Sequence, residues 1–263
     1  MSALNFLSSF ASTLTIMQSH HVLGMRVDYA PKSQFYKEII SRALAGQAGY
    51  CCVPNVHQCI LSYENPDHRR IVNSADWVLS DSTILQRTRS WLYGVPLQTP
   101  VRGAEIMIDL CAQAAGRGVK VGFFGASPKS IEGLKLRLSQ GYPSLNIAFA
   151  ASPPFRALGA EENDQFLSDM TAAGVQLLFV GMGCPKQETW MALNRDKFSG
   201  AMIGVGAAFD FNAGVVKAAP ATIHRLGFDW LWRLLAEPRR LFKRYMTTSP
   251  KFILLAIRQK MAA

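Results

Sequence analysis

Three short glycine-containing runs have residue types that suit an anionic, nucleotide-like ligand. The first, at 125–130, reads Gly-Ala-Ser-Pro-Lys-Ser and includes Gly125 and Ser127. A turn of this kind before a helix presents backbone N–H groups and a positive dipole end to a phosphate. An ordinary capped helix start has the same composition. The run also lacks the Gly-Lys-Ser/Thr order of a P-loop and the three-glycine dinucleotide fingerprint.

The second run, at 181–188, reads Gly-Met-Gly-Cys-Pro-Lys-Gln-Glu. Gly181 and Gly183 would let a ligand approach the backbone, and Lys186 adds a cation. Gln187 and Glu188 can hydrogen-bond a sugar, a ribose or a base edge. The third run, at 206–214, carries Asp210 among apolar neighbours, as a helix cap or as a ligand contact. Together the three runs favour a nucleotide pocket.

A second group of polar residues lies nearer the N-terminus and could act on an acceptor. Asp81 follows a short apolar run at the start of a polar loop, which is a natural position for a general base. The same Asp-Ser-Thr order also begins helices well. Arg102 precedes a helical segment and could donate two hydrogen bonds to a phosphate, or form a structural ion pair. Asn55 follows the first apolar run.

The elements that must position these residues alternate between strand and helix. Six apolar runs have strand length: 49–54, 77–79, 120–124, 145–150, 176–180 and 201–205. Helical periodicity occupies 35–44, 104–117, 130–142, 161–173 and 187–195. Near-continuous apolar strands alternating with helices predict an α/β fold, a Rossmann-like and mostly parallel sheet with helices on both faces. Ligands bind beyond the carboxyl ends of such strands, where the polar residues stand.

The positive charge is concentrated at the C-terminus. The chain of 263 residues has 28 Lys and Arg against 18 Asp and Glu, and residues 225–263 hold nine of the former and two of the latter. We therefore predict an α/β domain over 1–224 and a basic amphipathic helical appendage over 225–263, divided into short helices by Pro238 and Pro250. Its apolar and basic residues suit a membrane surface; a helix packed on the body and RNA binding are the alternatives.

Composition excludes several classes of protein. Hydrophobic residues make up 49% and charged residues 17%, which excludes a disordered chain. No apolar run reaches 18 residues, and the N-terminus lacks the pattern of a secretory signal. Five cysteines without paired spacing predict buried thiols in a reducing cytosol rather than disulfides or a zinc site. A nucleotide-dependent oxidoreductase and a non-catalytic membrane- or RNA-binding protein stay open on these residues.

Several longer segments, taken together, resemble the WecG/TagA/CpsF family of bacterial glycosyltransferases. They are Val180–Trp190, Gly204–Asp210, Ala219-Pro220, and Trp230–Arg240 followed by Lys243-Arg244-Tyr245. Ser74-Ala75-Asp76, Asp81 and Arg102-Gly103 fall where the family has matching segments. The resemblance covers nearly all of residues 22–250.

The resemblance implies an inverting, metal-independent transfer from a UDP-sugar to a polyprenyl-diphosphate-linked sugar. The reaction would take place at the cytoplasmic face of the bacterial inner membrane, on a peripheral protein. Within the family the chain is most similar to the glucosyltransferase of xanthan-type exopolysaccharide assembly. That likeness implies UDP-glucose as donor, glucosyl-diphospho-undecaprenol as acceptor and a β-1,4 linkage. An N-acetylmannosamine-type donor is the alternative.

The resemblance also implies roles for particular residues. Asp81 would be the base that deprotonates the acceptor 4-hydroxyl. Residues on the acceptor and phosphate side would be Asn55, Arg102, Arg233, Arg240 and Arg244. Residues on the nucleotide side would be Gly125, Ser127, Gly181, Gly183, Lys186, Gln187 and Asp210.

No metal, cofactor or nucleic acid is expected, whereas an anionic membrane surface is expected as a partner. The aromatic residues of the C-terminal segment leave a homo-oligomer open as well. Two departures from the family pattern, Ser82 in place of glycine and Val53 in place of threonine, bear on the acceptor.

Overall fold

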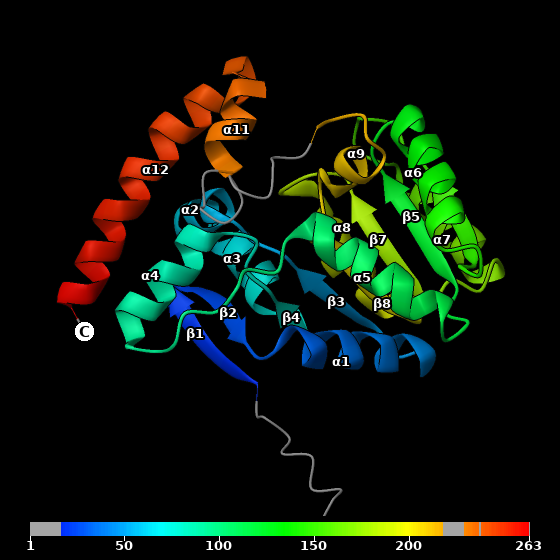
Figure 1. The fold of residues 1–263 in the computed structure, drawn as a ribbon, viewed down its shortest axis with the longest axis horizontal. Helices are drawn as coiled ribbons and strands as arrows, with labels where there is room; N and C mark the ends of the chain where they lie inside the picture. Colours follow the sequence, from blue (N-terminus) through cyan, green and yellow to red (C-terminus); the bar gives the residue numbers. More distant parts are fainter. Residues whose placement is uncertain (1–16, 218–228, 237, 263) are drawn as a thin grey trace, which may run out of the picture.

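The computed structural model describes residues 17–217, 229–236 and 238–262, and shows a parallel sheet between two layers of helices (Figure 1). Its six strands run in the order β4-β3-β8-β7-β5-β6 and all pair in parallel. They are β3 (Gly49–Cys52), β4 (Trp77–Val78), β5 (Val121–Gly125), β6 (Ile147–Ala151), β7 (Leu177–Gly181) and β8 (Ala201–Gly204). A separate antiparallel hairpin joins β1 (Gln18–Val22) to β2 (Met25–Tyr29).

Helices cover both faces of the sheet because successive strand residues point to opposite sides. Phe123 and Leu177 pack on one face, whereas their neighbours Phe124 and Leu178 pack on the other. The first face is covered by α1 (Lys32–Leu44), α5 (Gly103–Ala115), α6 (Pro128–Gly141) and α9 (Ala208–Asn212). The second is covered by α2 (Val56–Glu64), α3 (Pro66–Asn73), α4 (Thr83–Tyr93), α7 (Ala160–Ala172) and α8 (Lys186–Asn194). The predicted α/β architecture is therefore confirmed.

The sequence patterns located all six strands of the main sheet, but they missed the hairpin and α2–α4. Strand β1 reads QSHHV, and four of its five residues are at least partly exposed, so no alternation of apolar residues marks it. Helices α2 and α3 begin at Asn55 and Asn65, whose side chains cap them in succession. Two short helices separated by one residue leave too few turns for a helical period to show.

At the C-terminus, α11 (Asp229–Ala236) is followed by α12 (Pro238–Met261). The prediction that Pro250 divides this region is wrong, because Pro250 lies inside α12. A proline within a helix removes one hydrogen bond, yet packing after it holds the helix together. Phe252, Leu255 and Ala256 are buried, and α12 contacts α2 and α4. In Figure 1 the helix runs along the outside of α2 and α4, away from the sheet.

The predicted boundary at residue 225 falls outside the described residues. Within the described ranges, no helix has both the length and the apolar character that crossing a bilayer requires.

Candidate active site

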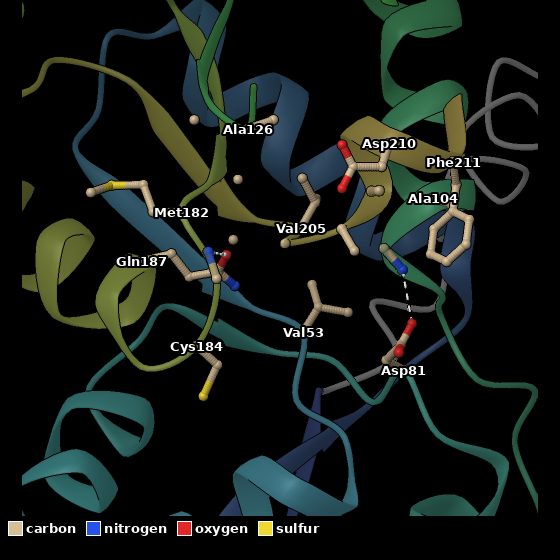
Figure 2. Close-up of a pocket in the computed structure, with 18 of the residues that line it drawn as sticks. Val53, Asp81, Ala104, Ala126, Met182, Cys184, Gln187, Val205, Asp210 and Phe211 are labelled. Atoms are coloured by element: carbon tan, nitrogen blue, oxygen red, sulfur yellow. Dashed lines mark hydrogen bonds between the residues drawn. The ribbon is translucent and has the colours of Figure 1, made fainter. Parts of the chain in front are cut away.

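A cavity of about 1040 Å³ opens at the carboxyl ends of the strands (Figure 2). Its walls are the loops that follow all six strands of the main sheet, together with the first turns of α5 and α9. The structure brings ten of the predicted site residues to this one cavity: Asn55, Asp81, Arg102, Gly125, Ser127, Gly181, Gly183, Lys186, Gln187 and Asp210. The sheet thus gathers residues that lie far apart in the sequence.

Asp81 is hydrogen-bonded to the first residue of α5. Its Oδ1 accepts a hydrogen bond from the N–H of Gly103, with a donor–acceptor distance of 3.0 Å (Figure 2). Gly103 lets α5 begin close to the sheet, because a Cβ there would stand 2.9 Å from the carbonyl oxygen of Val205. The cap of α4 is Ser82, whose Oγ accepts from the N–H of Leu85. The structure therefore separates the two alternatives for this loop: Ser82 starts the helix and Asp81 lines the cavity.

Asn55 has a structural task at the cavity wall. Its side chain accepts a hydrogen bond from the N–H of Gln58, and the Gln58 side chain accepts one from the N–H of Asn55. This reciprocal capping box fixes the first turn of α2 beneath the loop that carries Val53. The backbone of Asn55 is thereby held in place at the edge of the cavity.

Arg102 forms the ion pair that was one of its two alternatives. Its Nη1 lies 3.0 Å from Glu105 Oε1, and Lys32 Nζ lies 2.8 Å from the other oxygen of Glu105. Burial raises the pKa of Glu105, but hydrogen bonds from Lys32 and Arg102 outweigh it and hold the pKa below its usual value. All three side chains line the cavity, where two cations share one carboxylate. Sequence reasoning missed Lys32 and Glu105, which no motif marks.

The glycines that were predicted to line a nucleotide site have different structural roles. A Cβ at Gly125 would stand 2.5 Å from the carbonyl carbon of Gly181, and one at Gly181 would stand 2.5 Å from the Phe209 ring. These two glycines let the chain pack against itself, and both also line the cavity. A ligand contact at Gly181 stays a prediction. Gly183 has a φ of 80° and no atom within 4 Å of a Cβ position, so its surroundings remain open to a ligand.

Residues at the start of α6 and α9 are linked across the cavity wall. Ser127 caps α6 by accepting a hydrogen bond from the N–H of Ser130. This run is therefore a capped helix start, which was one of its two interpretations. The Ser130 hydroxyl donates to Asp210 Oδ1 at 2.5 Å. Between β5 and Ser127, Ala126 has a φ of 58°, a conformation that non-glycine residues rarely adopt. Its side chain points into the cavity (Figure 2).

Lys186 lies at the rim of the cavity. Its ammonium donates to the carbonyl oxygen of Phe155 at 2.9 Å and stands 5.5 Å from the centre of that ring. Phe155 itself is 94% exposed in the loop after β6. An aromatic ring beside a lysine at a cavity entrance could contact a base or a sugar face. Sequence analysis did not single out this loop.

Gln187 leads to Glu188, which the sequence analysis expected to hydrogen-bond a sugar or a base edge but which is buried and does not line the cavity. The Oε1 of Gln187 accepts from the N–H of Gly183, and its Nε2 donates to Glu188, which is fully buried. Burial raises the pKa of Glu188, while hydrogen bonds from Gln187, Gln58 and Cys184 oppose the rise.

Three of the predicted residues cannot be compared with the cavity. Arg233 lies on α11, and Arg240 and Arg244 lie on α12, but their side chains are outside the described part of the structure. Ala219-Pro220 also falls outside it.

All five cysteines are free thiols. Four are buried as predicted, whereas Cys184 is partly exposed and lines the cavity. Among the residues that the structure describes, no three His, Cys, Asp or Glu side chains are grouped to hold a metal ion. Metal independence stays a prediction.

A doubly covered parallel sheet with polar loops around a cavity at its carboxyl edge defines a Rossmann-like ligand-binding protein. Comparison with known proteins names its family. The chain matches the WecG/TagA/CpsF family of glycosyl transferases over residues 20–263 and belongs to that family. It is thus a sugar transferase, as the sequence motifs indicated.

A relative in Bacillus spizizenii is N-acetylglucosaminyldiphosphoundecaprenol N-acetyl-beta-D-mannosaminyltransferase. It is 29% identical to this chain over 202 residues, which are 76% of the chain and 75% of the relative. The sugar in its name differs from the glucose expected for the xanthan-type assignment.

Proposed function

We propose that the protein transfers an N-acetylmannosamine-type sugar from its UDP derivative to a polyprenyl-diphosphate-linked sugar. The observation that carries the proposal is the cavity in which Asp81 faces the loop of Gly183 and Gln187. Its volume of about 1040 Å³ is at the upper end of ligand pockets, which typically have roughly 300–1,000 Å³. Such a cavity has room for parts of two substrates at once.

In the proposed reaction, the acceptor hydroxyl oxygen attacks the anomeric carbon from the face opposite UDP. Asp81 takes the hydroxyl proton as the new C–O bond forms, and the bond to the UDP oxygen breaks. In Figure 2, Val53 and Val205 lie between Asp81 and Gln187, so the reacting carbon would sit over these two side chains. A carboxylate oriented by the N–H of Gly103 suits a general base.

The leaving diphosphate needs positive charge or N–H donors around it. Lys186 and the N–H groups at the start of α6 and α8 would supply them on the nucleotide side. Arg102 and Lys32, which share Glu105, would meet a phosphate on the acceptor side. This division agrees with the roles that the family resemblance implied for Arg102 and Lys186.

The donor sugar is the point on which the proposal departs from the glucose expectation. The Bacillus relative transfers an N-acetylmannosaminyl group to an N-acetylglucosaminyl lipid, which favours the alternative. Methyl groups of Val53 and Val205 on the cavity wall also suit an acetamido methyl better than a hydroxyl. We therefore propose N-acetylmannosamine, rather than glucose, as the donor sugar.

A peripheral position at the cytoplasmic face of the bacterial inner membrane is part of the same proposal. It is supported by the lipid-linked acceptor of the relative and by apolar side chains left exposed on α12. They include Ile253, Leu254 and Ile257, with exposed fractions of 58%, 51% and 43%. Burying such side chains in a membrane surface would remove apolar area from water.

The test is transfer of radiolabelled sugar from UDP-N-acetylmannosamine to N-acetylglucosaminyl-diphospho-polyprenol, with EDTA present. UDP-glucose with glucosyl-diphospho-polyprenol is run in parallel. Incorporation of N-acetylmannosamine that survives EDTA is the expected result. Transfer of glucose alone would restore the xanthan-type assignment, and transfer from neither donor would contradict the proposal.

A further inference from the structure

Glu188 forms a buried hydrogen-bonded junction beneath the cavity. It lies in the first turn of α8, and its side chain has no exposed surface. Its Oε1 accepts from Gln58 Nε2 at 2.6 Å and from Gln187 Nε2 at 2.8 Å. One carboxylate oxygen thus joins α2, which follows β3, to α8, which follows β7.

The two glutamine amides are held in one orientation by this junction. Gln58 Oε1 accepts from the N–H of Asn55 at 3.3 Å, and Gln187 Oε1 accepts from the N–H of Gly183 at 3.2 Å. A side-chain amide has one donating and one accepting end. A carboxylate that accepts both NH₂ groups therefore directs both oxygens toward the backbone of the cavity loops. A flipped amide would instead place its oxygen against the carboxylate.

The junction spans the end of the strand between these loops. β8 lies between β3 and β7, and it ends at Gly204. A Cβ at Gly204 would stand 2.9 Å from Gln187 Nε2, so the absence of a side chain there leaves room for the amide. The hydrogen bonds connect the loop of Asn55, on the acceptor side, to the loop of Gly183, on the nucleotide side.

We propose that Glu188 is a positioning residue for sugar transfer. Through Gln58 and Gln187, it holds the acceptor-side and nucleotide-side loops at a fixed separation. This inference rests on the proposed function, because it assigns the two loops to the two substrates. Glu188 itself is buried below the cavity and touches neither substrate.

A purely structural role makes a different prediction. Burial raises the pKa of Glu188, so a charge at this position costs stability at neutral pH. Replacement by the neutral isostere in Glu188→Gln would then leave stability equal or higher and function unchanged. A positioning role predicts instead that this variant keeps its stability but binds substrate less tightly.

The experiment compares the full-length protein with Glu188→Gln and Glu188→Met. It measures the melting temperature, the Kd for UDP by calorimetry, and the KM for the donor separately from kcat. For Glu188→Gln we expect an unchanged or higher melting temperature and a Kd weakened about three- to tenfold, because a neutral acceptor holds the amides less strongly. The donor KM should rise more than kcat falls. Glu188→Met removes the acceptor altogether and should weaken UDP binding by more than about tenfold.

Asn194→Ala is the matched control on the same helix. Asn194 is also buried and donates to the carbonyl oxygen of Trp190 at 2.8 Å, but it does not line the cavity. This control should lower the melting temperature and leave the Kd for UDP unchanged.

Each outcome bears on one proposal or the other. Wild-type affinity for UDP and wild-type KM in folded Glu188→Gln and Glu188→Met would overturn the positioning role. If Glu188→Met does not fold, Glu188→Gln decides alone, and failure of Glu188→Gln to fold would also overturn it. If the unaltered protein binds neither UDP nor a UDP-sugar, the proposed function is wrong, and this inference is wrong with it.

Discussion

Asp81 receives its hydrogen bond from the first N–H of α5, at the positive end of that helix. A backbone donor cannot change rotamer, so the carboxylate keeps its place on the cavity wall when substrates enter. The next residue, Ser82, caps α4, so the two neighbouring side chains have separate roles.

Replacing Asp81 with asparagine should abolish transfer without unfolding the protein. The amide oxygen can still accept from the N–H of Gly103, but the side chain can no longer take a proton from the acceptor. We expect kcat to fall by roughly 10²–10⁴-fold, with the Kd for UDP and the melting temperature close to those of the wild type. Steady-state kinetics and calorimetry on the purified variant check this. Normal turnover by folded Asp81→Asn would exclude Asp81 as the base.

A methyl group at Gly181 should disturb the packing between β7 and α9. The added Cβ would stand 2.5 Å from the Phe209 ring, and the strand and helix would have to separate. Gly181→Ala is expected to lower the free energy of unfolding by about 1–3 kcal/mol, measured by denaturant titration. Gly141→Ala at the end of α6 is the control, because nothing lies within 4 Å of its Cβ position. Equal stability of both variants would contradict the packing argument.

Asp76 joins three elements at the amino end of the sheet. Its Oδ1 accepts from Arg42 on α1 at 2.5 Å and from Arg195 at 3.1 Å, and its Oδ2 accepts from the N–H of Tyr50 on β3. Burial raises the pKa of Asp76, but hydrogen bonds from Arg195 and Tyr50 and the charge of Arg42 outweigh it, so the pKa is lowered. The ionised form is therefore the one that stabilises the fold.

Asp76→Asn should destabilise the protein in a pH-dependent way. A lowered pKa contributes stability above the unfolded-state value of roughly 3.9, and that stability is lost as the pH falls through the folded-state pKa. We expect the variant to be about 1–3 kcal/mol less stable at pH 7, with the difference shrinking below about pH 4. Urea titrations at several pH values give the comparison. A difference that does not change with pH would show that the charge of Asp76 is not responsible.

At the scale of elements, the main sheet could be predicted because its strands are apolar on both faces. Runs such as 120–124 and 176–180 are hydrophobic throughout, and long helices with clear periods separate them. The β1–β2 hairpin could not be predicted. It depends on contacts with distant residues, such as the hydrogen bond from Gln259 Nε2 to the carbonyl oxygen of His21. The prediction that Pro250 ends a helix failed for the same reason, because the local sequence does not show that Phe252, beyond the proline, is buried.

The candidate site likewise has residues that could be predicted from the sequence and residues that could not. Residues at strand ends, such as Asp81 and Gln187, could be located because a parallel sheet brings its carboxyl ends to one edge. The partners that orient them could not. Gly103 reaches Asp81 across 22 positions, and Gln58 reaches Glu188 across 130. Glu105 was missed because its importance depends on Lys32, which only the folded chain brings near it.

At the scale of the whole molecule, the C-terminal half of α12 has apolar residues on two opposite sides. Phe252, Leu255 and Ala256 are buried against the body, and the other side exposes Ile253, Leu254, Ile257 and Met261. The helix is fastened by Gln259, which accepts from the N–H of Leu23, and by Lys260, which donates to the carbonyl oxygen of Leu92. One side of α12 thus packs on the body, as one of the alternatives predicted, whereas the other side is exposed.

The triple variant Ile253→Ser, Leu254→Ser and Ile257→Ser should bind membranes less well. These side chains are exposed, so the change should scarcely alter the melting temperature while removing apolar area that would enter the bilayer. We expect at least about tenfold weaker binding to phosphatidylglycerol-containing vesicles in a sedimentation assay. Leu136→Ser with Leu193→Ser, at 59% and 74% exposure on α6 and α8, is the control. Equal loss in both variants would show that α12 is not the docking element.

The strand order has a consequence for how the protein would respond to its donor. Asp81 and Gln187 are more than 100 positions apart in the chain. They line the same cavity because β8, a late strand, lies between β3 and β7. A molecule held between their loops would act as a removable cross-link between the two halves of the chain. When the cavity is filled, amide protons along β3 and β7 should therefore exchange with solvent more slowly in both strands together, rather than in one strand alone.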